Sequence, residues 1–201
     1  KFYDNPDRAR VEHLTNLIYK KLGIKVADTQ LMTLDQKLAI ASPEVPGAQG
    51  TYLDDQRSSP EVRNGFVADA YLANWDVVGL NYDNIVRSSD GSMARIDNGG
   101  SMIFRAQGAK KRFAPTDIPE FSNMRNPDYP AGRVFADLTG DEIEQQALDL
   151  IVKLTEEDIE RLVSESGLEG PVREEIVKGL IGRRQFLIEQ YWHIQQEGSQ
   201  R

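Results

Sequence analysis

Residues 74–100 constrain the fold of this chain more than any other part of the sequence. They read NWDVVGLNYDNIVRSSDGSMARIDNGG and place Asp, Asn and Gly around two short apolar runs, residues 85–86 and 93–96. Because the Ser-Asp-Gly sequence between these runs is typical of a tight turn, the stretch predicts a β-hairpin. Asn84 would then begin one strand and Asp97 would follow the other, at neighbouring ends of the hairpin.

The oxygen atoms at this end of the hairpin suit a magnesium site. An amide oxygen from Asn84 and a carboxylate from Asp97 are the hard ligands that Mg²⁺ takes together with phosphate oxygens. Asp76, at the end of a predicted helix that carries Trp75, could reach the same cleft as a base or a hydroxyl-orienting group. The alternative is that each polar residue only forms a turn or ends a helix. Their joint occurrence on one hairpin favours a functional site.

The order of these residues resembles the catalytic loop and metal-binding motif of the protein-kinase-like fold. In protein kinases, a catalytic Asp precedes a metal-binding Asn, and the Asp of D-F-G follows. The thirteen-residue step from Asn84 to Asp97 matches that family, and DNG stands where D-F-G would be. The sequence NWDVVGLNYDN is similar to the N-x-D catalytic loops of atypical kinases of the bacterial HipA type and of the phosphatidylinositol-kinase-like group.

The catalytic loop departs from the common kinase pattern in two ways. The step from Asp76 to Asn84 is eight residues rather than five, which makes Asn81 the rival metal ligand. We favour Asn84 because the apolar pair after it and the step to Asp97 both fit. Trp75 stands where H-R-D kinases have Arg, so we do not expect activation through a phosphorylated loop that contacts this Arg.

The resemblance also assigns the N-terminal part of the chain. It implies that Lys1 holds the ATP phosphates and pairs with Glu12 on the first helix. It also implies a hinge that grips adenine near Ser42 and Val45. No Gly-rich loop precedes Lys1, so we expect the strands that would cover the phosphates to be absent from this sequence.

Local signals predict the remaining elements. Asn5 and Pro6 begin a helix that Gly23 ends, and a hairpin follows within residues 28–42. Residues 43–60 are rich in Pro, Gly and Ser and are predicted to be a linker. One helix is expected to start at Pro60, and residues 101–137 are expected to be a long irregular segment. The rest is predicted to be helical, with capping boxes at Thr139/Glu142 and Thr155/Asp158 and a last helix that opens at Pro171.

We therefore predict an α+β, protein-kinase-like two-lobe fold. Residues 1–45 would form a truncated small N-lobe with a strand, a helix and a hairpin. Residues 46–201 would form a mainly α-helical C-lobe with the catalytic loop, the metal-binding motif and the C-terminal helices. The expected activity is ATP- and Mg²⁺-dependent phosphoryl transfer to a hydroxyl acceptor, a protein being one candidate. Three alternatives stay open: a pseudokinase or partner-binding domain, a lipid or small-molecule kinase, and adenylyl transfer.

The charge of the chain limits its partners. A net charge of −8 argues against nucleic acid and anionic membranes, and no apolar run is long enough to span a bilayer. The one dense basic patch comprises Arg105, Lys110, Lys111 and Arg112; we favour a solvated loop over a site for a phosphate or an acidic substrate. We assign no chemistry to His13 or His193. The absence of Cys fits the cytoplasm, and it also fits delivery as an effector.

Overall fold

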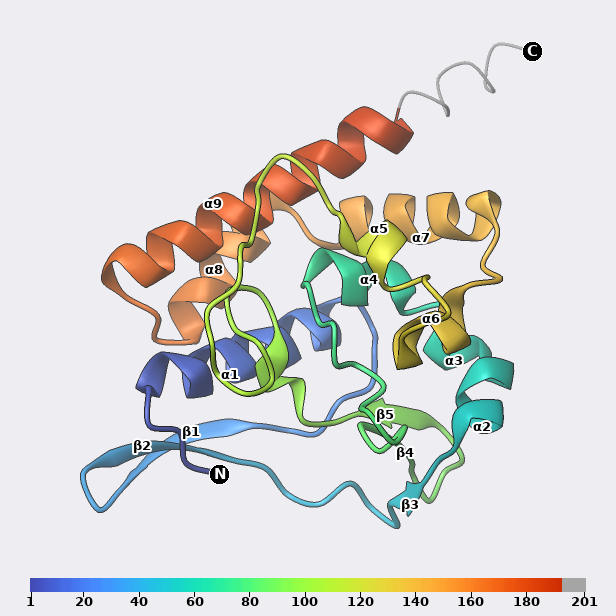
Figure 1. The fold of residues 1–201 in the computed structure, drawn as a ribbon. Coiled ribbons are helices and arrows are strands. Elements are labelled where there is room, and N and C mark those ends of the chain that lie inside the picture. The colour runs from blue at the N-terminus through green and yellow to red at the C-terminus, as the bar shows by residue number, and fades with distance from the viewer. Residues whose placement is uncertain (193–201) are drawn as a thin grey trace.

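The computed structural model describes residues 1–192, and residues 193–201, including His193, lie outside the described part (Figure 1). Helix α1 (Pro6–Lys21) packs against strand β2 (Lys37–Ala41) and against helix α8 (Glu156–Glu165). The α1 helix begins where the sequence predicts, because the Asn5 side chain accepts a hydrogen bond from the Asp7 amide at 3.0 Å. It therefore lies between a small β layer and the large group of helices, as Figure 1 shows.

The small β layer is the predicted N-terminal hairpin. Strand β1 (Gln30–Leu34) pairs antiparallel with β2, and the two residues between them have positive φ angles of 49° and 62°. Two left-handed residues form the tight turn that suits a two-residue hairpin loop. Lys1 runs beside this sheet, since its carbonyl oxygen accepts a hydrogen bond from the Ile40 amide at 3.0 Å.

The second sheet contains the hairpin of residues 74–100. Strands β3 (Gln49–Gly50), β4 (Ile85–Arg87) and β5 (Met93–Arg95) form an antiparallel sheet in that order, so the predicted hairpin is confirmed. The prediction that residues 43–60 are a linker is wrong in part. This segment contributes strand β3 and helix α2 (Leu53–Ser58): Gln49 pairs with Arg87, and the Tyr52 amide donates a hydrogen bond at 3.0 Å to Oδ2 of Asp55 at the start of the helix.

The single helix predicted from Pro60 is two helices, α3 (Pro60–Arg63) and α4 (Phe66–Tyr71). The break falls at Gly65, where a Cβ atom would lie 2.1 Å from Nη2 of Arg95. The same guanidinium donates a hydrogen bond at 3.0 Å to the carbonyl of Val62, the last turn before the break. A buried arginine therefore takes the space and the acceptor that a continuous helix would use.

Residues 101–137 are not irregular throughout, because they contain α5 (Glu120–Asn123) and α6 (Pro130–Phe135). Their apolar side chains, such as Phe104 and Phe113, join the main core. The chain then continues through α7 (Gly140–Lys153), α8 and α9 (Gly170–Leu187), followed by a π-helical turn at Ile188–Trp192. Both predicted capping boxes, at the starts of α7 and α8, are confirmed.

One core joins α1, the hairpin β4–β5 and the helices α4 to α9. None of the helices within residues 1–192 is long and apolar enough to cross a membrane.

Candidate active site

Three of the predicted site residues meet where α1 approaches the end of β5. Nζ of Lys1 contacts Oδ1 of Asp97 in an ion pair and lies 3.4 Å from Oε2 of Glu12. Burial opposes the charged form of Lys1, but Glu12, Asp97 and Tyr3 outweigh it and raise the pKa of Lys1 above its ordinary value. The structure therefore holds a cation between two carboxylates, in the pairing that the resemblance implies.

The glycines after Asp97 allow this close packing. A Cβ atom on Gly99 would lie 2.3 Å from the hydroxyl oxygen of Tyr3 and 3.2 Å from Oε2 of Glu12. The Tyr3 hydroxyl itself donates a hydrogen bond to Glu12. A larger residue at position 99 would displace the Tyr3 hydroxyl from Glu12, which gives the glycine after Asn98 a structural reason.

Asp76 and Asn84 form the second half of the cluster. Nδ2 of Asn84 donates hydrogen bonds to the carbonyl oxygen of Asp76 at 2.7 Å and to its Oδ2 at 3.3 Å. Partial burial raises the pKa of Asp76; the carboxylates of Asp97 and Asp83 also raise it, whereas Asn84 and Lys111 oppose the shift. The charge of Asp97 therefore acts on Asp76, and the Ile96 amide, one residue before Asp97, donates a hydrogen bond to the Asn84 carbonyl at 2.9 Å. A shared catalytic role of 76, 84 and 97 stays a prediction.

The surroundings of Asp76 differ from the prediction in one respect. Helix α4 ends at Tyr71, so Trp75 and Asp76 lie in the loop after the helix and not on it. Ala73 has a left-handed φ of 50°, which turns the chain out of the helix before Asp76 is reached.

Asn84 and Asp97 have the oxygen atoms that a magnesium ion would need. The amide nitrogen of Asn84 is used on Asp76, so its Oδ1 is available as an acceptor, and the Asp97 side chain is 57% exposed. Among the described residues, no three His, Cys, Asp or Glu side chains are grouped to hold a metal alone. This donor set fits Mg²⁺ that is bound jointly with phosphates and not in an all-protein cage. The rival Asn81 is exposed, and it is Asn84 that contacts Asp76.

The two predicted adenine-binding residues have different surroundings. Val45 is buried in a small apolar cluster with Val86 and Ala94, and Ile96 packs against this cluster. Ser42 is exposed and its hydroxyl donates to the carbonyl of the next residue, so it is not part of that cluster. The apolar cluster thus extends to Ile96, which directly precedes Asp97. Adenine binding there stays a prediction.

A buried hydrogen-bond network, which sequence reasoning missed, holds both loops in place. We call it the Asp69 network; its members are Asp69, Arg95, Tyr19, Asn74, Asn98 and Asn16. Asn74 donates to the Tyr19 hydroxyl and to Oδ1 of Asn98, at 3.0 Å each. Because Asn74 lies two residues before Asp76 and Asn98 directly follows Asp97, this network joins the two loops beneath the cluster.

A partly buried contact fixes the exposed Trp75. Its indole nitrogen donates a hydrogen bond at 3.0 Å to Oε1 of Glu120, and Oε2 of Glu120 lies 3.1 Å from Nη1 of Arg183. Glu120 and Arg183 are both buried. The position that carries Arg in H-R-D kinases is therefore tied to α5 and α9 through a tryptophan.

Two cavities open beside Asp76. The larger, about 480 Å³, is lined by apolar side chains that include Trp75, Leu80 and Tyr129, with Arg105 at its wall. The smaller, about 150 Å³, shares Trp75, Asp76 and Arg105 and adds Lys111. Because both cavities include Asp76, a group bound in either lies within reach of its carboxylate.

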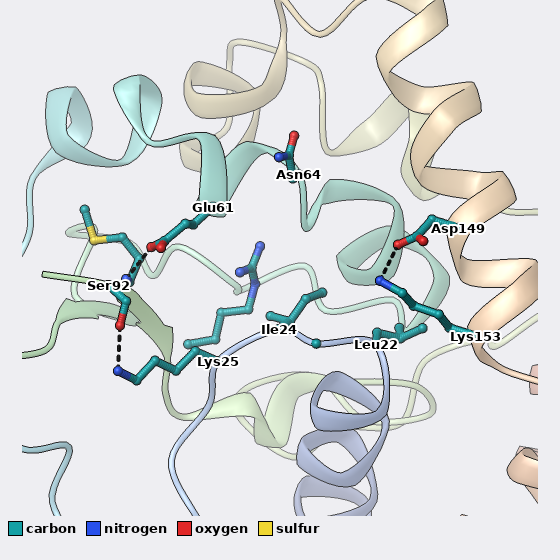
Figure 2. A pocket seen from close by; sticks show the side chains of 11 residues that line it. Leu22, Ile24, Lys25, Glu61, Asn64, Ser92, Asp149 and Lys153 are labelled. Atoms are coloured by element: carbon teal, nitrogen blue, oxygen red, sulfur yellow. Dashed lines mark hydrogen bonds and ion pairs between the residues drawn. The ribbon is translucent and has the colours of Figure 1, made fainter. Parts of the chain in front are cut away.

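A third cavity, about 270 Å³, lies elsewhere and is drawn in Figure 2. It is lined by the residues that follow α1, among them Lys25, and by others that include Ser92, Asp149 and Lys153; none of 76, 84 and 97 lines it. Both lysines already have partners: Lys25 contacts Ser92 at 2.5 Å and Lys153 contacts Asp149 at 2.7 Å, as the dashed lines show. This cavity has no unpaired lysine for a ligand.

The small N-terminal layer, the helical remainder and the cluster between them define a protein with a kinase-like fold. Among solved structures, the chain is similar to the crystal structure of the Helicobacter pylori proinflammatory kinase CtkA, with a TM-score of 0.60 and 14% sequence identity. The match covers 97% of this chain and 90% of that one. At this identity the similarity establishes the fold alone. No family model and no curated protein matches the sequence.

Proposed function

We propose that this chain is an ATP- and Mg²⁺-dependent phosphotransferase that acts on a hydroxyl acceptor. One observation carries the proposal: within a kinase-like fold, Lys1, Glu12 and Asp97 meet beside the bonded pair of Asp76 and Asn84. Phosphoryl transfer depends mainly on positioning and on neutralising charge, which a cluster of this composition can supply.

The nucleotide side of the site would use four residues. Lys1 binds the ATP phosphates, and Glu12 holds the Lys1 side chain in place from α1. Asn84 and Asp97 hold Mg²⁺ through their oxygen atoms. When bound, the ion neutralises phosphate charge, and this is the contribution that the protein residues alone do not make. The exposure of the Lys1–Asp97 pair supports this assignment, because both side chains are accessible to a ligand.

The acceptor side would use Asp76 and the cavities beside it. The acceptor oxygen bonds to the γ-phosphorus, the bond from that phosphorus to the bridging oxygen of ADP breaks, and the hydroxyl proton passes to Asp76. The raised pKa of Asp76 supports its role as proton acceptor, because it brings the carboxylate nearer to neutral pH. Trp75, fixed by Glu120, forms a wall that both cavities share.

Two finer assignments belong to this proposal. We place the boundary between the lobes at residues 45 and 46, between the buried Val45 and strand β3. The subgroup of the fold, HipA-type or phosphatidylinositol-kinase-like, stays a prediction from the catalytic loop.

The test measures Mg-ATP turnover and the Mg-ATP-dependent thermal shift of the whole chain and of Asp97→Ala. We expect the variant to lose turnover and the metal-dependent shift while it stays folded, with only a small fall in melting temperature, because Asp97 is exposed but has a left-handed φ of 58° that Ala adopts less readily. Asp90→Ala, at the tip of the same hairpin, is the matched control and should stay active. Asn84→Ala and Asn81→Ala form a second pair, of which only the first should lose activity.

Two outcomes would change the proposal. An active Asp97→Ala protein would remove the metal assignment. A wild-type chain that binds Mg-ATP without turnover would point to the pseudokinase alternative.

A further inference from the structure

The basic patch that follows Asp97 is not uniform. Arg105, Lys110 and Arg112 are exposed, as the interpretation of a solvated loop requires, but Lys111 is only partly exposed and its side chain turns inward to two backbone carbonyls. The backbone causes this difference, because residue 104 bridges residue 110 and the Lys111 amide donates to the carbonyl of Ile103 at 2.8 Å. That interpretation is therefore wrong for Lys111.

The Lys111 side chain connects the two loops of the candidate site. Its Nζ donates hydrogen bonds to the carbonyl oxygen of Ala73 at 2.5 Å and to that of Gly100 at 2.7 Å. Ala73 lies three residues before Asp76, and Gly100 lies three residues after Asp97. One amine thus holds together the segments that carry the proposed base and the proposed metal ligand.

The same side chain lines the smaller cavity beside Asp76. An ammonium group has three N–H donors, and two are bound to carbonyls, so one is left for an oxygen atom in the cavity. The Trp75 ring lies near it, with 5.8 Å from Nζ to the ring centroid. A lysine placed in this way combines a structural contact with a charge that a bound group can meet.

Charged groups from several elements face Lys111. They are Glu120 on α5, Arg183 on α9, Arg105 in the preceding loop and Asp76 in the loop after α4. Burial lowers the pKa of Lys111 to about 7, with Glu120 and Asp76 opposing the shift and the two arginines adding to it. The charge on Lys111 is therefore sensitive to pH close to neutrality.

We infer that Lys111 is a positioning residue for phosphoryl transfer: it fixes the Asp76 loop against the Asp97 loop and places a positive charge beside the transferred group. This inference rests on the proposed function. It adds a residue from the segment after the metal-binding motif, which the catalytic-loop pattern does not include. Its charge would act on negative charge that develops on the phosphoryl oxygens and on the acceptor.

The experiment compares Lys111→Met and Lys111→Arg with Lys110→Met, which removes the exposed neighbouring lysine. We expect Lys111→Met to lower kcat by about 100-fold, the usual cost of losing one preorganised donor, with a small change in KM for Mg-ATP. Lys110→Met should stay within about twofold of the wild type, because surface changes rarely matter. Equal kcat values for the two Met variants would overturn the inference.

The pH profile of kcat separates a charge effect from a purely structural one. In the wild type, the ammonium form of Lys111 decreases as the pH rises through about 7, so kcat should fall there. Lys111→Arg keeps its charge at all these pH values, so this fall should be absent from its profile. If both proteins show the same fall, Lys111 contributes no charge to the reaction.

Hydrogen exchange tests the positioning role without catalysis. Lys111→Met should increase amide exchange in residues 72–76 and 98–102, whereas Lys110→Met should not. Unchanged exchange in both variants would remove the positioning role. A wild-type chain without turnover would refute the proposed function and this inference together. Equal Mg-ATP turnover in the wild type and in Lys111→Met would refute the inference alone.

Discussion

Arg95 and Asp97 lie two residues apart in the chain and each forms an ion pair, but one pair is buried and the other is exposed. Arg95 on β5 binds Asp69 through two hydrogen bonds, at 2.8 and 2.7 Å, and the side chains are 2% and 0% exposed. Asp97 binds Lys1, and these side chains are 57% and 42% exposed. The buried pair sits beneath the site, and the exposed pair forms its surface.

The difference in burial decides what each pair can do. A buried charge that loses its partner is left without solvent, so Arg95 and Asp69 cannot exchange partners without a large loss of stability. The attraction between two exposed charges is weak and is screened by salt, so Lys1 and Asp97 can separate to bind a ligand. The buried pair provides a frame, and the exposed pair provides groups that can take new partners.

The largest predicted effect comes from breaking the buried pair. Arg95→Met leaves the Asp69 carboxylate buried without its cation, and we expect a loss of about 3–5 kcal/mol in the free energy of unfolding. Chemical denaturation monitored by circular dichroism measures this loss. Arg87→Met is the matched control on the adjacent strand, because it breaks an exposed pair with Asp55 and should cost about 1 kcal/mol or less. Similar losses in the two variants would contradict the comparison.

The positions of Asn84, Asp97 and the helix that carries Glu12, around the exposed pair, could be predicted from the sequence because the signals are local. Asn84 and Asp97 lie at the two ends of a hairpin whose turn residues are distinctive, and strand pairing then forces them together. The helix that carries Glu12 has a clear N-cap and stop signal. The pairing of Lys1 with Glu12 and Asp97 came from the resemblance and not from the pattern of residues.

The buried half could not be predicted, because its partners are far apart in the sequence. Asp69 meets Arg95 across 26 residues, and Asn98 meets Asn16 across 82. An acidic residue in an apolar helix gives no indication of which cation it will find. The one local signal is Arg95 within a short apolar strand. Its side chain also explains the helix break at Gly65, which the sequence does not predict.

A smaller predicted effect concerns pH. Burial, followed by the nearby Asp69, raises the pKa of Tyr19 well above its ordinary value of 10.0. The folded protein therefore keeps this proton at a pH where the unfolded chain loses it, so the stabilisation is intact below pH 10 and is lost as the pH rises further. The loss is about 1.4 kcal/mol per pH unit for one proton.

The test of this effect compares slopes and not absolute stabilities. Tyr19→Phe costs a hydrogen bond to Asp69 at every pH, but its free energy of unfolding should fall less steeply than that of the wild type between pH 10 and about 11.5. Tyr52→Phe removes an exposed hydroxyl and should leave the slope unchanged. A parallel decline in the wild type and Tyr19→Phe would mean that the buried network does not hold the Tyr19 proton.

The smallest predicted effect is the coupling between Lys1 and Asp97. A double-mutant cycle with Lys1→Met and Asp97→Asn should give an interaction energy of about 0.2–1 kcal/mol that decreases as salt is added. The cycle is needed because Lys1 also contacts Glu12, and the subtraction removes that shared contribution. A coupling comparable to that of the buried pair would make Lys1–Asp97 a structural contact, and Asp97 would then have to break it at high cost before it could bind a metal ion. A weak, salt-sensitive coupling would leave both groups available to the nucleotide, as the proposed function requires.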